Sequence, residues 1–255
     1  MGKKRPLNPV KFRRAKMKAA KSRDEGRLYL NGRASLSLIA LVVANLVPVA
    51  GVIFYGWDHR LVIALFWIEN LIIGLFNVVK MCGAMIVNKQ KGLSGIVTPL
   101  FFILHYGLFC AAHGLFLWST LGLGELPAEA LIFGPNTGPL QIFDEGLKVF
   151  VGFVELYSPV IVLGIVSLIL SRFVSFIENF ILKGEIFELT PRDLMAKPYG
   201  KIIALHVGII MGAVAIDRFG SSLWLLLAIV GFKIIVDAIT HMKEHRTSEL
   251  KVDEL

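Results

Sequence analysis

The chain has 255 residues, of which 55% are hydrophobic and 18% are charged, and its mean hydropathy is +0.69. Soluble domains carry about 25% charged residues, so this composition excludes an ordinary soluble fold. The formal net charge of +8 is concentrated in residues 1–33, which contain twelve Lys and Arg residues against two acidic ones. We therefore expect an all-α, polytopic membrane helix bundle that begins after a basic tail.

Residues 1–33 are predicted to form a cytoplasmic tail that binds anionic lipid headgroups, at about 1 kcal/mol for each Lys or Arg near the surface. The only aromatic residues interleaved with these charges are Phe12 and Tyr29. Proteins that bind nucleic acid commonly add aromatic stacking to a basic surface, so we do not expect a nucleic-acid partner. The lipid bilayer is the partner that the tail indicates.

Apolar stretches of about 20 residues, the length needed to cross a bilayer, predict six transmembrane helices between residues 34 and 242. The fourth is expected to continue as a mixed helix over 171–183, which leans on or leaves the membrane surface. A turn at Gly220 should join the last two helices as an antiparallel hairpin. The six predicted helices run over 35–57, 61–87, 96–121, 147–170, 201–219 and 223–241.

The distribution of basic residues predicts the orientation of the bundle. The tails 1–33 and 243–255 and the segment 171–200 all carry Lys or Arg, whereas the loop 124–146 has four acidic residues and no Lys or Arg. Both termini are therefore expected in the cytoplasm, with the loop 124–146 outside. We expect the protein in the prokaryotic plasma (inner) membrane, and the sequence leaves open an oligomer or a larger complex.

Four ionisable residues come to a similar depth in the cytoplasmic half of the bundle: His105, His206, Asp237 and His241. Ionisable side chains at membrane depth are costly unless they are paired, hydrated or metal-bound, so such a cluster is first a functional-site hypothesis. Three imidazoles and a carboxylate suffice for Zn²⁺ or non-haem iron. In this hypothesis His105, His206 and His241 bind the metal, and Asp237 acts as a catalytic base or orients a ligand.

The same residues are also compatible with other interpretations. Buried transmembrane histidines often do no more than hydrogen-bond a neighbouring backbone or hydroxyl group, or line a hydrated cavity. His241 could be an interfacial residue at a cytoplasmic helix end, where the helix dipole favours cations. Alternatively, His105 and His206 could be the axial ligands of a haem between two facing helices.

A second polar group is expected nearer the outer face of the bundle. Glu69 and Asn70 in the second span and His113 in the third lie at similar depths, and Glu155 in the fourth is a further buried-acid candidate. A Glu69–His113 pair would relieve the burial cost of both side chains. It would be either an interhelical hydrogen bond that orders the bundle or half of a proton pathway toward His105, roughly 12 Å along the same helix.

Three further features complete the predicted interior. Lys233 lies near mid-membrane, one turn before Asp237, which favours an ion pair between them. Lys80 lies close enough to the cytoplasmic boundary to extend its ammonium group to water. Gly208 and Gly212 form a small-xxx-small pattern that is typical of close helix packing.

The runs FWIEN at 66–70, HYG at 105–107 and HG at 113–114, with Asp237 and His241, resemble an uncharacterised family of prokaryotic multi-spanning membrane proteins, known as a domain of unknown function. The resemblance covers the second to sixth spans and implies a six-span bundle without indicating an activity. A weaker analogy, through the His241-x-x-x-His245 spacing, is to intramembrane zinc hydrolases of the alkaline ceramidase and adiponectin-receptor type. This chain has six predicted spans where those hydrolases have seven, and both of its histidines lie at or beyond the membrane boundary.

These patterns lead to three hypotheses about function. The first is an integral membrane protein of unassigned activity, whose polar cluster stabilises packing, provides a small-molecule or proton route, or serves an accessory or scaffold subunit. The second is a metal-dependent intramembrane hydrolase that acts on a lipid, with Zn or Fe activating a water molecule. The third is a haem-binding electron-transfer protein. The sequence alone leaves open whether the protein is an enzyme.

Overall fold

The computed structural model describes residues 42–43, 45–88, 93–124 and 138–253, with side chains described except at 93, 94, 237 and 240–253. The predictions for the basic tail, most of the 124–146 loop and the side chains of Asp237 and His241 therefore lie outside the described residues. Residues 45–236 form one compact unit, to which all contacts below belong. From Asp237 onward the backbone continues as helix α10 (Leu223–Asp253).

The described residues are helical and contain no β-strand, which confirms the all-α prediction for this part of the chain. Among the described residues, four helices are long and apolar enough to cross a membrane, and two further apolar helices, Asn45–Tyr55 and Leu223–Val236, are shorter. Residues 35–41 and 44 of the first predicted span lie outside the described residues, so the number six stays a prediction. The four long helices are α2 (His59–Val87), α3 (Leu93–Thr120), α6 (Val160–Ser175) with the π-helix η1 (Phe176–Leu182), and α8 (Pro191–Ala196) with α9 (Tyr199–Phe219).

The predicted fourth span, 147–170, is wrong. The structure divides it between α5 (Pro139–Tyr157) and α6, because Ser158 leaves the helix with φ −63° and ψ 140°. A residue that precedes proline is biased toward this extended conformation, whereas hydropathy averaged over a window is blind to the break. The predicted helical continuation is confirmed over 171–182, in the end of α6 and in η1, but these residues belong to the membrane-length helix Val160–Leu182 and not to a separate surface helix.

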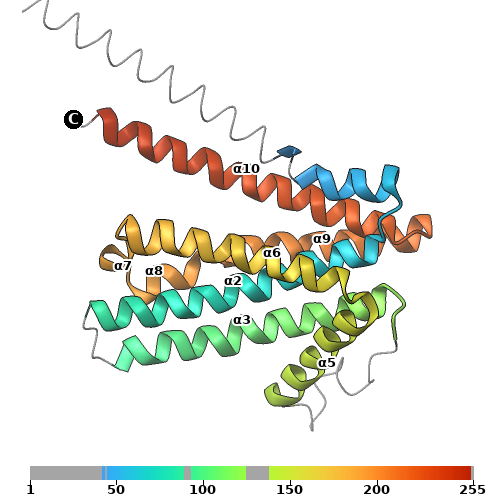
Figure 1. Ribbon diagram of the computed structural model, residues 1–255, viewed down its shortest axis with the longest axis horizontal. Helices are drawn as coiled ribbons and strands as arrows, with labels where there is room; N and C mark the ends of the chain where they lie inside the picture. The colour runs from blue at the N-terminus through green and yellow to red at the C-terminus, as the bar shows by residue number, and fades with distance from the viewer. Residues whose placement is uncertain (1–41, 44, 89–92, 125–137, 254–255) are drawn as a thin grey trace, which may run out of the picture. The chain divides into compact units, whose positions relative to one another are not determined.

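Helix α2 is the centre of the described unit. It packs against α3 and α6, and Figure 1 shows these three helices side by side, while α5 packs on α3. The Trp67 ring of α2 is fully buried and donates a hydrogen bond from Nε1 to the Cys110 carbonyl of α3 at 2.8 Å. A side chain at Gly114 would collide with this ring, so the glycine in the HG run is what lets α2 and α3 approach.

Helices α9 and α10 form the hairpin that the sequence predicts. Gly220 ends α9 in the left-handed region at φ 71°, a conformation that glycine adopts without steric cost. A Cβ atom added at Gly208 would lie 2.7 Å from the Cα atom of Ile229, and one added at Gly212 would lie 2.7 Å from the Cα atom of Leu225. The small-xxx-small face therefore packs directly on the α10 backbone, as predicted.

The segment between η1 and α9 folds against α2 through two asparagine side chains. Asn77 donates from Nδ2 to the Leu194 carbonyl at 3.1 Å. Asn88 donates from Nδ2 to the carbonyls of Ile186 and Leu189, both at 3.2 Å. These bonds fix the segment beside the C-terminal part of α2, and the Leu194 carbonyl also accepts from the Lys197 N–H. The segment contains α7 (Glu185–Glu188) and α8.

Candidate functional site

A carboxylate shared by two cations joins three helices inside the described unit. Glu69 of α2 accepts hydrogen bonds from Arg172 of α6 and, at 3.1 Å, from Lys233 of α10. The Glu69 side chain is only 12% exposed, so its charge would be costly without these partners. Lys233 also lies 5.7 Å from the centre of the Phe66 ring. We call Glu69, Arg172 and Lys233 the Glu69 cluster.

The Glu69 cluster corrects the predicted pairings. Glu69 does not pair with His113, and Lys233 contacts Glu69, while the Asp237 side chain lies outside the described residues. The error came from the position of Arg172. Because α6 begins only after Pro159, Arg172 lies within a membrane-length helix and reaches the depth of Glu69, whereas the sequence analysis assigned it to a surface helix.

His113 contacts His206 of α9. The two rings stand nearly perpendicular, at 87°, with 2.8 Å between His113 Nε2 and His206 Nδ1. His113 is buried, and its Nδ1 lies 2.6 Å from the Phe109 carbonyl oxygen. A carbonyl oxygen can only accept, so the His113 Nδ1 carries the hydrogen of the neutral ring, and His113 Nε2 accepts from the His206 Nδ1–H. This hydrogen bond links α3 to α9.

His105 lies in a different environment from His206. It is exposed, with Nδ1 2.9 Å from the Tyr199 hydroxyl oxygen and its ring stacked on Phe101. His206 contacts His113, which lies eight residues or about 12 Å along α3 from His105. The structure therefore does not bring together His105 and His206, the two described members of the predicted metal set and of the predicted haem pair. Among the residues with described side chains, no three His, Cys, Asp or Glu residues could hold a metal ion.

Asn70 and Glu155, the two remaining polar residues of the prediction, differ in burial. Asn70 is buried and donates from Nδ2 to the Phe66 carbonyl at 2.9 Å, while its Oδ1 has no partner among the described residues. Glu155 is exposed on α5, so its prediction as a buried acid is wrong. It lies two residues from the fully buried Phe153, which places it on the opposite face of the helix.

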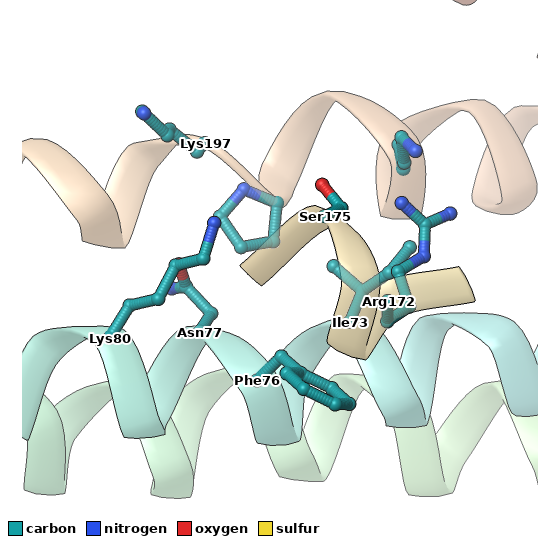
Figure 2. Close-up of a pocket in the computed structure, with 9 residues that line it drawn as sticks. Ile73, Phe76, Asn77, Lys80, Arg172, Ser175 and Lys197 are labelled. Atoms are coloured by element: carbon teal, nitrogen blue, oxygen red, sulfur yellow. The ribbon is translucent and has the colours of Figure 1, made fainter. Parts of the chain in front are cut away.

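A cavity of about 130 Å³ lies between α2, α6 and the start of α9. Figure 2 shows Lys80 extending from α2 and Arg172 from α6 toward the segment that carries Lys197. Four of the lining side chains are cationic and none is a carboxylate. We call this space the cationic cavity, and it is lined by Ile73, Phe76, Asn77, Lys80, Arg172, Ser175, Lys197, Pro198 and Lys201.

The carboxylates that face these cations lie outside the cavity lining. Glu185 contacts Lys197 with 3.4 Å between Oε2 and Nζ, and Glu69 accepts from Arg172 Nη2 while also interacting electrostatically with Lys201. The Arg172 Nε atom is buried and has no hydrogen-bond partner among the described residues. The lining therefore presents positive charge to any molecule that enters.

Sequence analysis missed the cationic cavity, although it recorded some of the charges. It treated Lys80, Lys197 and Lys201 as cations at the cytoplasmic boundary, where they indicate orientation. Their meeting at one point depends on the fold-back of the segment between η1 and α9. The one available signal was the number of cations that the spans place at the same membrane boundary.

Comparison with protein families gives one match. Residues 28–254 match a family described as "Family of unknown function (DUF6498)". The match begins well before the second predicted span, so the resemblance extends further than the sequence motifs indicated. Searches of curated proteins and of solved structures returned no match, and the analogy to zinc hydrolases receives no support from them. Because the match covers most of its length, the chain belongs to this family of unknown function.

Proposed function

We propose that the protein is an integral membrane protein that binds a small anion in the cationic cavity. The observation that carries this proposal is the lining of the cavity, with four cationic side chains and no carboxylate. The cavity lies within a unit that contains four helices of membrane length. Four cations around one cavity repel one another at membrane depth even with Glu69 and Glu185 beside them, so a bound anion would stabilise the folded state.

The environment of α6 supports the membrane part of the proposal. Only 6% of the apolar window in Val160–Leu182 is buried inside the structure, which leaves an almost wholly apolar helix surface to be covered. Leu163 and Leu170 are 68% and 58% exposed. A soluble protein rarely exposes a continuous apolar surface of this length, whereas lipid covers it without cost.

The positions of the Glu69 cluster and the cationic cavity support the anion-binding part. Arg172 belongs to both, since its Nη2 donates to Glu69 and its side chain lines the cavity. Glu69 is therefore a fixed counter-charge on the far side of Arg172, and it holds the guanidinium in place. This arrangement corresponds to the small-molecule interpretation of the polar interior and gives that molecule a negative charge.

The membrane part is tested by carbonate extraction of membranes that contain the full chain. We expect the protein to stay in the membrane pellet, and recovery in the soluble fraction would contradict the proposal. The anion-binding part is tested by thermal unfolding in a non-ionic detergent, with sodium salts of several anions and chloride salts of several cations at one ionic strength. We expect the melting temperature to depend on the anion and not on the cation.

Two variants make the anion test specific. Lys80→Gln removes a cation that lines the cavity, and Arg192→Gln removes an exposed cation of α8 that does not. The dependence on the anion should weaken in Lys80→Gln and persist in Arg192→Gln. An equal response of the two variants would assign the effect to the general surface charge of the protein.

A further inference from the structure

We infer that the anion is a phosphate group, supplied either by the headgroup of a phospholipid or by a small soluble phosphate compound. The inference rests on the proposed function and adds the chemical class of the ligand. It is carried by the kinds of donor that line the cationic cavity and by their positions on three separate elements, α2, α6 and the start of α9.

Arg172 supplies the donor that best distinguishes phosphate from other anions. A guanidinium group is planar and presents parallel N–H donors that match two oxygens of a phosphate. Glu69 accepts from Nη2, while the buried Nε has no partner among the described residues. Buried donors without a partner are rare in folded proteins, and such a donor indicates that a ligand or a water molecule binds there. The side chain as a whole is 28% exposed and lines the cavity, so a rotation of the guanidinium toward a bound phosphate would give Nε the missing acceptor.

Ser175 supplies a neutral donor beside Arg172. It lies three residues further along α6, so the two side chains share a face of the helix. The Ser175 hydroxyl oxygen accepts a hydrogen bond from Asn179 Nδ2 at 3.1 Å, which leaves its own hydrogen free to donate. The Asn77 amide also reaches the lining, but its Nδ2 already donates to the Leu194 carbonyl. The hydroxyl is therefore the neutral donor most available to a phosphate oxygen.

The lysines favour an anion with more than one negative charge. Lys80 of α2 lines the cavity together with Lys197 and Lys201, which lie before and after Pro198 in the sequence, and Lys197 also contacts Glu185. A phosphate monoester carries about 1.5 to 2 negative charges near pH 7 and spreads its acceptors over three oxygens. A halide or a carboxylate offers one charge and would meet fewer of these donors.

The size of the cavity limits how much of the ligand it encloses. Its volume of about 130 Å³ is below the roughly 300 Å³ at which sites begin to enclose whole drug-sized molecules. The cavity therefore suits a phosphate group with the remainder of the ligand outside. A phospholipid would place its headgroup here and its acyl chains along the exposed apolar surface of α6, whereas a soluble compound would extend into water.

The first experiment measures binding of inorganic phosphate to the full chain in a non-ionic detergent from which phospholipid has been removed. Thermal unfolding is followed against phosphate and against chloride at matched ionic strength. We expect phosphate to raise the melting temperature more than chloride does. In Arg172→Lys, which keeps the charge and loses Nε, and in Lys80→Gln, we expect phosphate affinity to fall about tenfold or more, as loss of a charge-assisted hydrogen bond predicts. Arg192→Gln should bind as the native chain does.

The second experiment separates the two sources of phosphate. The protein is reconstituted in nanodiscs of phosphatidylcholine, with and without phosphatidic acid, and is then purified. Lipid that stays bound to it is identified by its mass in native mass spectrometry. Retention of phosphatidic acid by the native chain, lost in Arg172→Lys, assigns the site to a lipid headgroup. A response to free phosphate without retained lipid assigns it to a soluble compound. Either result supports the shared chemistry, and the absence of both overturns it.

The outcomes distinguish this inference from the proposed function. If chloride and phosphate stabilise the native chain equally and Lys80→Gln weakens both effects, the cavity binds anions without preference, so the inference fails and the proposed function stands. If no anion acts on the native chain, both fail. If Arg172→Lys binds phosphate as the native chain does, the role of Nε is wrong and the inference is overturned.

Discussion

His206 donates a hydrogen bond from Nδ1 to Nε2 of His113 across 2.8 Å, and this bond links α3 to α9 inside the described unit. The Phe109 carbonyl holds the other nitrogen of His113, so both nitrogens of this buried ring have a partner. A change in either histidine leaves a polar atom of the other without its partner.

We expect His206→Ala to lower the free energy of unfolding by about 1–3 kcal/mol, because the buried His113 Nε2 loses its hydrogen-bond partner. His113→Ala should cost more, since it also removes a well-packed ring. In the double variant the losses should not add, and the difference should be at least about 0.5 kcal/mol. The measurement is a double-mutant cycle by reversible unfolding in detergent. Strict additivity would mean that the bond contributes nothing.

The Glu69 cluster should be the most sensitive site in the chain. Glu69→Gln leaves the cations Arg172 and Lys233 facing each other without the shared carboxylate, and removing one member of a buried ion pair costs about 3–5 kcal/mol. We expect this variant to accumulate poorly and to unfold at a much lower temperature than the native chain. Replacing Lys233 by Met in the same variant should recover part of the loss, because one uncompensated charge is removed.

Glu178→Gln is the control for the Glu69 change. Glu178 pairs with Lys183 on the exposed surface of η1, where both side chains are about 60% exposed. Exposed ion pairs contribute about 0–1 kcal/mol. Equal stability of Glu178→Gln and Glu69→Gln would contradict the assignment of Glu69 as a buried counter-charge.

The close approach of α9 and α10 is tested at two glycines. A Cβ atom at Gly208 would lie 2.7 Å from the Ile229 Cα atom, and backbone cannot move aside as a flexible side chain can. We expect Gly208→Ala to destabilise by about 1–3 kcal/mol, measured by unfolding in detergent. Gly231→Ala lies on α10 with no atom within 4 Å of the added Cβ. It should be neutral or stabilise by about 0.5–1 kcal/mol, because alanine loses less entropy in a helix.

The orientation of α9 is tested by cysteine labelling at two exposed positions, Glu188 before the helix and Ser221 after it. In a chain whose native Cys82 and Cys110 are replaced by Ala, Glu188→Cys and Ser221→Cys should react from opposite sides of sealed vesicles. The positive-inside rule places Glu188 in the cytoplasm. Labelling of both positions from the same side would mean that α9 does not cross the membrane.

Sequence patterns were sufficient for features that depend on local chemistry. A long apolar stretch predicts a helix whatever its neighbours are. In an apolar medium the backbone N–H and C=O groups must form hydrogen bonds with one another, and a helix satisfies them within one segment. Gly220 and the Gly208 and Gly212 pair predicted the α9–α10 hairpin, since a left-handed turn and a close helix contact both require the absence of a side chain. The motifs at 66–70 and 105–114 indicated the family.

The fourth span shows where local patterns fail. Residues 147–170 are mostly apolar, and hydropathy averaged over the window did not show that Pro159 separates α5 from α6. That break moved Arg172 from the expected surface to a place beside Glu69. The sequence therefore named Glu69 and Lys233 as buried charges but assigned Glu69 to the wrong contact, because Arg172 lay in a helix whose boundaries were misplaced.

By itself, the sequence determined the all-helical class, the apolar character of the helices, the tight turn after α9 and which side chains would be expensive to bury. Only the tertiary structure decided which of those side chains meet. Glu69 joins Arg172 and Lys233, and His113 joins His206. Lys80 and Lys197 line one cavity because α2 packs between α3 and α6 while α8 folds back on it. Helix formation is decided within a few residues, whereas the pairing of charges depends on which helix faces pack together, and distant parts of the chain determine that packing.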